Sequence, residues 1–177
     1  SDFESSEEYL LKAHNYFLEH GDDRDMAGSY NNLADIYKFK EKYQEAAKLY
    51  QKAVEINIRS NNQLWLAINY NNLAQTSFYL GNNKEALEYF KKSGDIYKDL
   101  NDVSGVVSNF NNLGYLSSEL NDQKSAIAYY EKGYELAKKH NLKEWKMQVS
   151  QNLYISYQQI GDYKNAFETL LEFKAFE

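Results

Sequence analysis

The sequence contains neither proline nor cysteine, although the chain is 177 residues long. The absence of proline removes the strongest helix breaker and the stiffest linkers, and therefore favours long helices. The absence of cysteine excludes disulfides, thiolate metal ligands and a cysteine nucleophile, but it does not identify the redox compartment. The strict apolar–polar alternation of a β-strand is also missing, so we expect an all-α protein.

Positive charge and long apolar runs are scarce as well. The net charge is -6 and no cluster of lysine and arginine stands out, which argues against a nucleic-acid partner. No apolar run approaches the roughly 20 residues that span a bilayer, so no direct membrane insertion is expected in this segment. No signal peptide is visible, but the chain begins at Ser1 rather than methionine, and we expect it to be a segment of a longer protein. A cytoplasmic location is favoured, and a periplasmic one is left open.

Catalytic and metal-binding patterns are not found. His14, His20 and His140 lack the spacing of metal ligands. The acidic stretch 22–25 lacks the calcium-loop pattern and is typical of a turn followed by a helix N-terminus. No glycine-rich phosphate loop or nucleophile elbow occurs. The sequence therefore predicts no metal, no cofactor and no enzymatic activity.

A repeat of 40 residues runs through the chain. The triplet Asn-Asn-Leu begins at residues 31, 71 and 111, and Gln151-Asn152-Leu153 continues the phase. Two further markers keep the same period, and they are Ala46, Ala86, Ala126 and Ala166, followed by Tyr50, Phe90, Tyr130 and Leu170. Three markers locked to one period indicate a repeat architecture.

Each repeat is expected to form two helices, because its apolar residues recur at spacings of three and four. The first helices are predicted at about 24–40, 63–80, 103–120 and 143–160, and the second at about 43–59, 83–99, 123–140 and 163–176. Glycine and asparagine at most of the breaks suit helix ends. Residues 2–20 match an unpaired second helix, which gives about nine helices. We expect one domain over 1–177, with repeats at about 24–60, 63–100, 103–140 and 143–177.

These residue types resemble the tetratricopeptide repeat. The first copy offers Tyr30, Leu33, Ala34, Tyr37, Ala46, Tyr50 and Ala53 at the positions of that pattern. Two features depart from it: the period is 40 rather than about 34 residues, and the closing proline is replaced by Ile58 in the first copy. HEAT and armadillo repeats have similar periods but lack this register. The longer, asparagine-rich unit is similar to kinesin light chains, to spindle-orientation scaffolds and to tetratricopeptide segments of bacterial sensor kinases and transcription regulators.

The resemblance implies a right-handed α-solenoid of stacked antiparallel helical hairpins, with the first helices lining a concave groove. It also implies which side chains line that groove. They are Asn31, Asn32, Asn71, Asn72, Asn111, Asn112, Gln151 and Asn152, with Lys38, Phe39, Gln75, Phe78, Tyr79 and Tyr115 beside them.

The amides at these positions need a physical explanation, since asparagine costs a helix interior roughly 0.5 kcal/mol relative to alanine. One interpretation is that they bond to the backbone of an extended peptide. The other is that they bond to the neighbouring repeat and set its register. We favour peptide contact for the Asn32 series and register for the Asn31 series. Trp65 and Trp145 share one repeat position and are interpreted as covering the junction between repeats.

The leading functional hypothesis is a non-catalytic scaffold that docks an extended or helical segment of another protein or peptide. A clamp for a terminal carboxylate is not expected, because the sites of its cations hold Gly28, Ile68, Ser108 and Gln148. The alternative is a ligand-sensing solenoid within a larger bacterial signalling protein. The apolar last helix, with Phe167, Leu170, Leu171, Phe173 and Phe176, also predicts further helices, a docked partner or self-association.

Overall fold

The computed structural model describes residues 2–174, and the side chains of residues 8–172. Within this range every regular element is an α-helix, which confirms the all-α class. The nine helices are α1 (Asp2–His20), α2 (Asp23–Phe39), α3 (Tyr43–Arg59), α4 (Gln63–Tyr79), α5 (Asn83–Asp99), α6 (Val103–Glu119), α7 (Gln123–Lys139), α8 (Lys143–Gln159) and α9 (Tyr163–Lys174). No helix in the described part of the chain has both the length and the apolar character of a membrane span.

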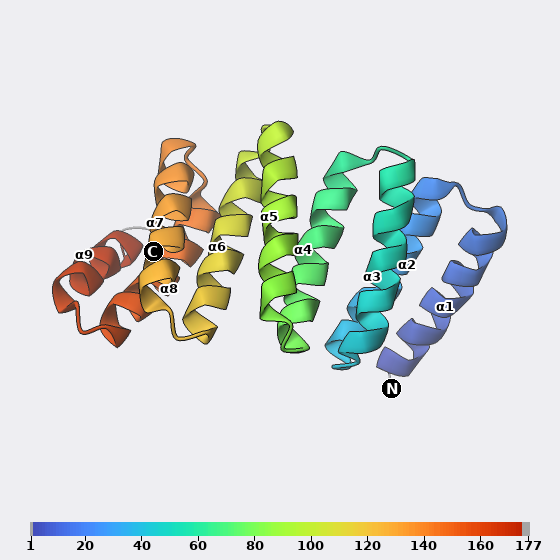
Figure 1. The fold of residues 1–177 in the computed structure, drawn as a ribbon, viewed down its shortest axis with the longest axis horizontal. Coiled ribbons are helices and arrows are strands. Elements are labelled where there is room, and N and C mark those ends of the chain that lie inside the picture. The colour runs from blue at the N-terminus through green and yellow to red at the C-terminus, as the bar shows by residue number, and fades with distance from the viewer. Residues whose placement is uncertain (1, 175–177) are drawn as a thin grey trace. The chain divides into compact units, whose positions relative to one another are not determined.

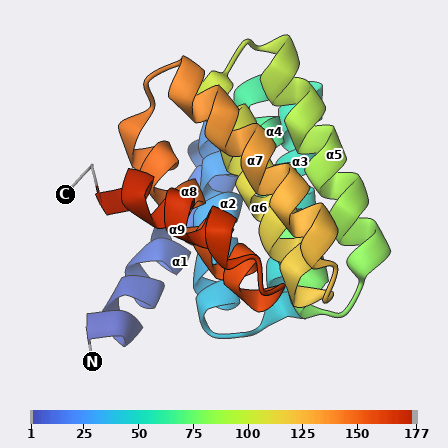
Figure 2. The same ribbon diagram turned by 90° about the vertical axis from the view of Figure 1, so that its left-hand side faces the viewer.

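The chain forms two compact units, and their boundary lies within α5. Unit 1 comprises residues 1–96 and unit 2 comprises residues 97–177. In unit 1, α1 packs on α2, α2 on α3 and α3 on α4 (Figure 1). In unit 2, α6 and α7 lie side by side (Figure 2), α7 packs on α8 and α8 on α9. Each unit is thus a stack of antiparallel hairpins, as the repeat predicts. A single domain and a right-handed coil over the whole chain stay predictions.

The helices are equal in length because the turns between them are equally spaced. Helices α2 to α8 each contain 17 residues. A left-handed residue lies in each turn from α2 onward, at Glu41, Asn61, Gly81, Asn101, Asn121, Asn141 and Gly161. After each, the next N–H bonds back to a carbonyl five residues earlier, as Asn62 N does to Asn57 O at 2.9 Å. This is the Schellman arrangement, which satisfies carbonyls at a helix end.

Each unit has its own apolar core, built from the small and aromatic residues of the repeat. The core of unit 1 contains Ala34, Ala46, Tyr50, Val54, Leu66 and Leu73. The core of unit 2 contains Val107, Ala126, Ile127, Tyr130, Tyr134, Ala137, Val149 and Leu153. The small residues are required for close packing. A Cβ added to Gly114, for example, would lie 2.5 Å from a ring carbon of Tyr130.

The predicted helix bounds agree with the structure to within three residues wherever the chain is described. The glycines and asparagines predicted to end helices do so at positions 61, 81, 101, 121, 141 and 161. Two breaks differ: Gly21, after α1, does not take the left-handed conformation, and after α2 it is Glu41 that does so, with φ 58°. On α9, Phe167 and Leu171 are exposed, whereas the side chain of Phe173 and all of Phe176 lie outside the described residues. Self-association through this face stays a prediction.

Glu41 is the least suitable of the left-handed residues, because its Cβ and long side chain gain nothing from that conformation. The left-handed region costs an ordinary residue about 1–2 kcal/mol, which asparagine largely avoids. We therefore expect Glu41→Asn to raise the free energy of unfolding by about 1 kcal/mol. Urea unfolding followed by helical circular dichroism measures the change.

Asn121 provides the matched control, since it is exposed and left-handed at the equivalent point of a later turn. Asn121→Glu should lower the free energy of unfolding by about the same 1 kcal/mol. Two changes of the same sign would show that backbone conformation does not govern these turns.

Candidate functional site

Buried amide side chains connect successive repeats within unit 1. Asn31 on α2 is 6% exposed, and its Oδ1 accepts from Asn69 Nδ2 at 2.8 Å and from Asn72 Nδ2 at 3.2 Å, both on α4. Asn69 Oδ1 in turn accepts from Asn57 Nδ2 on α3 at 2.7 Å. Three helices are therefore joined by one network of amides, here called the amide network.

A carboxylate anchors one end of the amide network. Asn31 Nδ2 lies 3.2 Å from Asp35 Oδ2, and the Tyr50 hydroxyl donates to Asp35 Oδ1. Burial, followed by the bond to Asp35, raises the pKa of Tyr50, so its hydroxyl stays protonated as the donor. Lys38 Nζ lies 3.7 Å from Asp35 Oδ1 and 3.5 Å from Gln75 Oε1, so much of its charge is offset.

Unit 2 repeats part of this arrangement. Asn152 Nδ2 on α8 donates to Asn111 Oδ1 on α6 at 2.7 Å. The two residues are 41 apart in sequence, as Asn72 and Asn31 are. In both units the second asparagine of one repeat thus bonds to the first asparagine of the repeat before it. This geometry supports the register interpretation for Asn31 and Asn111, which are both buried.

The second asparagines are more accessible. Asn32 is exposed and forms no hydrogen bond with a described residue, whereas Asn72, Asn112 and Asn152 are half-buried. Asn71 is also half-buried and has an interaction partner, and Gln151 is exposed. Asn32 is consequently the amide of unit 1 best placed to meet a ligand.

Aromatic side chains gather at the ends of the first helices. In unit 1, Tyr79 stacks on Tyr43 with ring centroids 4.9 Å apart, and Phe78 is tilted against Tyr79 at 5.6 Å. We call these three residues the aromatic cluster. Phe39 and Tyr79 are 71% and 51% exposed. In unit 2, the predicted groove residue Tyr115 is also exposed.

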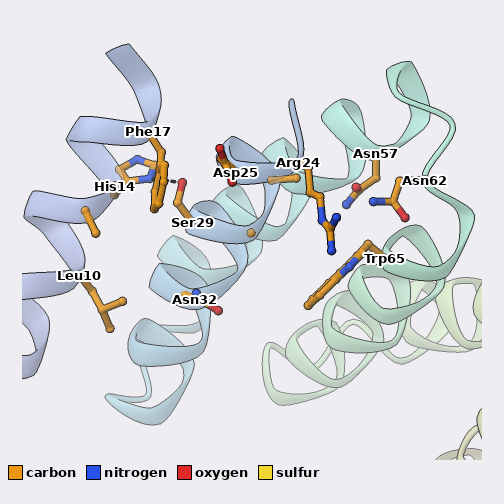
Figure 3. Close-up of a pocket in the computed structure, with 13 residues that line it drawn as sticks. Leu10, His14, Phe17, Arg24, Asp25, Ser29, Asn32, Asn57, Asn62 and Trp65 are labelled. Carbon is orange, nitrogen blue, oxygen red and sulfur yellow. Dashed lines mark hydrogen bonds between the residues drawn. The ribbon is translucent and has the colours of Figure 1, made fainter. Parts of the chain in front are cut away.

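A pocket of about 280 Å³ opens beside the amide network in unit 1 (Figure 3). Side chains of α1 to α4 line it, among them His14, Arg24, Asn32, Asn57 and Trp65. His14 Nδ1 lies 2.9 Å from Ser29 Oγ, and burial, with a smaller contribution from Lys52, lowers the pKa of His14. This bond ties α1 to α2.

Sequence reasoning did not identify the pocket or several of the residues around the predicted groove. Asn57 occupies a helix position that holds Tyr97 and Ala137 in later repeats, so it gives no polar pattern of its own, whereas Asn69 recurs as Asn109 one repeat later. Tyr43 begins a second helix and lies outside the predicted groove set. The signals that could have pointed here were Asn32, the recurrence of Asn69 at Asn109 and the repeated tryptophan position. Among the described residues, no group of histidine and carboxylate side chains is arranged to hold a metal.

The amide network predicts a contrast between two adjacent asparagines. Asn31→Ala leaves Asn69, which is fully buried, with an unpaired donor. We expect it to lower the free energy of unfolding by about 1–3 kcal/mol. Asn32→Ala removes no hydrogen bond to a described residue and should be neutral or stabilising by up to roughly 0.5 kcal/mol. Urea unfolding compares the two variants, and equal effects would exclude a structural role for Asn31.

Comparisons with known proteins agree with this architecture. A sequence profile described as "Tetratricopeptide repeat" matches residues 1–59, 25–99 and 65–139. Comparison with curated proteins gave no match. Among solved structures, BtubC (BKLC) from P. vanneervenii is 24% identical with a TM-score of 0.85, and the alignment covers 99% of this chain and 73% of that one.

Two other solved structures share the fold. The kinesin light chain TPR-like repeats of Podosopora anserina are 18% identical with a TM-score of 0.79, covering 98% of this chain and 86% of that one. A Rap protein complexed with Competence and Sporulation Factor is 16% identical with a TM-score of 0.85. That alignment covers 99% of this chain but only 49% of the Rap protein. With its profile matches extending over most of its length, the chain belongs to the tetratricopeptide repeat family.

Proposed function

We propose that this chain is a non-catalytic module that docks a segment of another polypeptide on the first helices of its repeats. The observation that carries the proposal is the exposure of large aromatic side chains, Phe39 and Tyr79, beside an ordered set of amides. Aromatic residues contribute most to binding where they are held rigidly at a surface. The stacking of Tyr79 on Tyr43 supplies that rigidity.

The amide network supports the proposal indirectly. Because Asn69 donates to Asn31 across the two helices, these helices are fixed in register and the accessible amides stand at defined positions. Asn32 offers both a donor and an acceptor, which are the groups that an extended peptide backbone requires. A segment lying along α2 and α4 would meet Asn32 and then the aromatic cluster.

Lys38 does not act as a cationic clamp for an acidic segment. Lys38 lies beside Asp35, so no strong positive field develops at the centre of this surface. Shape, aromatic burial and backbone hydrogen bonds are then the main sources of affinity. A neutral or mixed sequence suits such a surface better than a uniformly acidic one.

A second candidate is a sensing role within a larger signalling protein. The fold shared with a Rap protein complexed with Competence and Sporulation Factor favours this candidate, because that factor is bound there by a protein with a similar framework. In that case the docked segment is a signal peptide, and its effect is passed to another part of a longer chain. Both candidates require the same docking surface.

The exposed aromatic residues provide the test. Random peptides selected on the immobilised chain should bind it with micromolar dissociation constants. Phe39→Ala and Tyr79→Ala should each weaken binding about tenfold, because each removes an aromatic contact of about 1.4 kcal/mol. Isothermal titration calorimetry with the selected peptides measures the dissociation constants.

Leu87→Ala is the control, since Leu87 is an exposed apolar residue of α5 outside the proposed surface. It should leave peptide binding unchanged. Circular dichroism of all three variants confirms that the helices are intact. Peptides that bind the two aromatic variants as tightly as the unmodified chain would refute the proposed surface.

A further inference from the structure

The amide network has a fixed direction, and it ends in the pocket of unit 1. A carboxylate cannot donate, so Asp35 requires Asn31 to present its NH₂ group, which leaves Asn31 Oδ1 to accept. Asn69 must then donate to Asn31 and accept from Asn57. The same logic assigns the remaining oxygen, Oδ1 of Asn57, as the terminal acceptor.

That terminal oxygen has no partner among the described residues. Asn57 is 1% exposed, yet its Oδ1 accepts no hydrogen bond. Its side chain lines the pocket together with Arg24, Asn62 and Trp65, and Figure 3 shows these four residues gathered at one side of it. A buried acceptor left unpaired costs free energy, so a ligand that offers an N–H to it gains affinity.

Arg24 and Trp65 place solvent-exposed hydrogen-bond donors at the same side of the pocket. The Arg24 guanidinium forms no ion pair within residues 8–172, and both it and the Trp65 indole N–H can only donate. Unit 2 shows what the same positions do when they satisfy each other. There Trp145 Nε1 donates to Ser104 Oγ at 2.8 Å, with the same 41-residue separation as Trp65 and Arg24.

Unit 2 also differs at the positions equivalent to the amide side of the pocket. Two repeats later, the positions of Asn57 and Asn69 are held by Ala137 and Val149, which are fully buried in the core of unit 2, although the copy of Asn69 one repeat later is the buried Asn109. At the equivalent positions of unit 2, the framework therefore holds a hydrogen-bonded pair, Trp145 and Ser104, and two apolar side chains, Ala137 and Val149. Within the described residues, the unit 1 form differs in combining the donors of Arg24 and Trp65 with one unpaired, buried acceptor.

We propose that this pocket binds a carboxylate that lies next to a peptide N–H. The carboxylate accepts from the Arg24 guanidinium and the Trp65 indole, and the neighbouring N–H donates to Asn57 Oδ1. An acidic side chain within a peptide and a terminal carboxylate both have this chemistry. The inference rests on the proposed function, because it assigns an acidic residue to one end of the docked segment.

The size and charge of the pocket agree with this ligand. About 280 Å³ is at the lower limit for a ligand pocket, which suits one amino-acid residue rather than a larger molecule. A cationic ligand would be repelled by Arg24. Asp25 also lines the pocket, but Figure 3 shows it on the side of His14 and Ser29, away from Trp65.

The two tryptophans make a direct measurement feasible, since the chain contains no others. The indole N–H resonances of the ¹⁵N-labelled chain are recorded during titration with short peptides blocked at their N-termini. One peptide carries an internal glutamate and an amidated end, a second is all alanine with a free terminal carboxylate, and a third has glutamine in place of glutamate. The Trp65→Phe variant assigns the two resonances.

We expect the Trp65 resonance to move with the glutamate peptide or the free-carboxylate peptide at millimolar concentration, and the Trp145 resonance to stay. Whichever of the two binds identifies the source of the carboxylate. Arg24→Ser, which installs the residue of unit 2, should weaken that binding about tenfold. The double variant Asn57→Ala/Asn69→Val, which installs the residues found two repeats later, should weaken it similarly, and urea unfolding followed by helical circular dichroism reports whether the fold is kept.

Two results would overturn the inference. The first is a Trp65 resonance that does not move with either carboxylate peptide, which would leave Asn57 Oδ1 to be satisfied by water alone. The second is a shift that is equal for the glutamine peptide or that persists in Arg24→Ser. Failure of the proposed function is distinguishable, because the selected peptides would then bind Phe39→Ala and Tyr79→Ala normally while the pocket still responds to carboxylate.

Discussion

The regular placement of left-handed turns determines most of this structure. Because a Schellman turn recurs at 41, 61, 81, 101, 121, 141 and 161, helices α2 to α8 all have the same length. Equal helices bring residues of equivalent repeat position to equivalent places in each hairpin. The hydrogen bonds between residues 41 apart, Asn72 with Asn31, Asn152 with Asn111 and Trp145 with Ser104, are consequences of that regularity.

The same regularity explains why asparagine is tolerated inside these helices. A lone asparagine opposes helix formation, and burying its amide without partners costs more. In unit 1 each buried amide meets another from a different helix, so the desolvated groups are nearly all paired. Such pairing is directional, and it penalises a slip in register more strongly than apolar contacts do. The asparagines that fix the framework are therefore different from those left to meet a ligand.

The sequence predicted the fold well because its signals repeat. The markers at Asn31, Ala46 and Tyr50 recur at a fixed period, and the turn residues are mostly asparagine and glycine, so helix number, pairing and bounds could be inferred. Glu41 could not be foreseen, since glutamate carries no turn preference and is held left-handed by the helices on either side. Asn31 is buried and Asn32 is exposed because of the way the helices pack. The repeat pattern indicates which helices pair, but it does not give the exposure of each side chain. Asn57 has no amide counterpart in unit 2 and so produced no periodic signal, whereas Asn69 recurs one repeat later as the buried Asn109 and could have been recognised.

The differences between the two units carry more functional information than the repeat itself. A repeat scaffold is stable when each position satisfies its neighbour, as Trp145 and Ser104 do, or is apolar, as Ala137 and Val149 are. Where one copy instead leaves a buried polar group unpaired, the local free energy of the unliganded protein rises, and a ligand that pairs with this group gains affinity. Asn57 is a departure of this kind, and it lines one pocket together with the exposed donors of Arg24 and Trp65. In a protein built from similar hairpins, the specificity of ligand binding therefore has to come from the positions at which the repeats carry different residues.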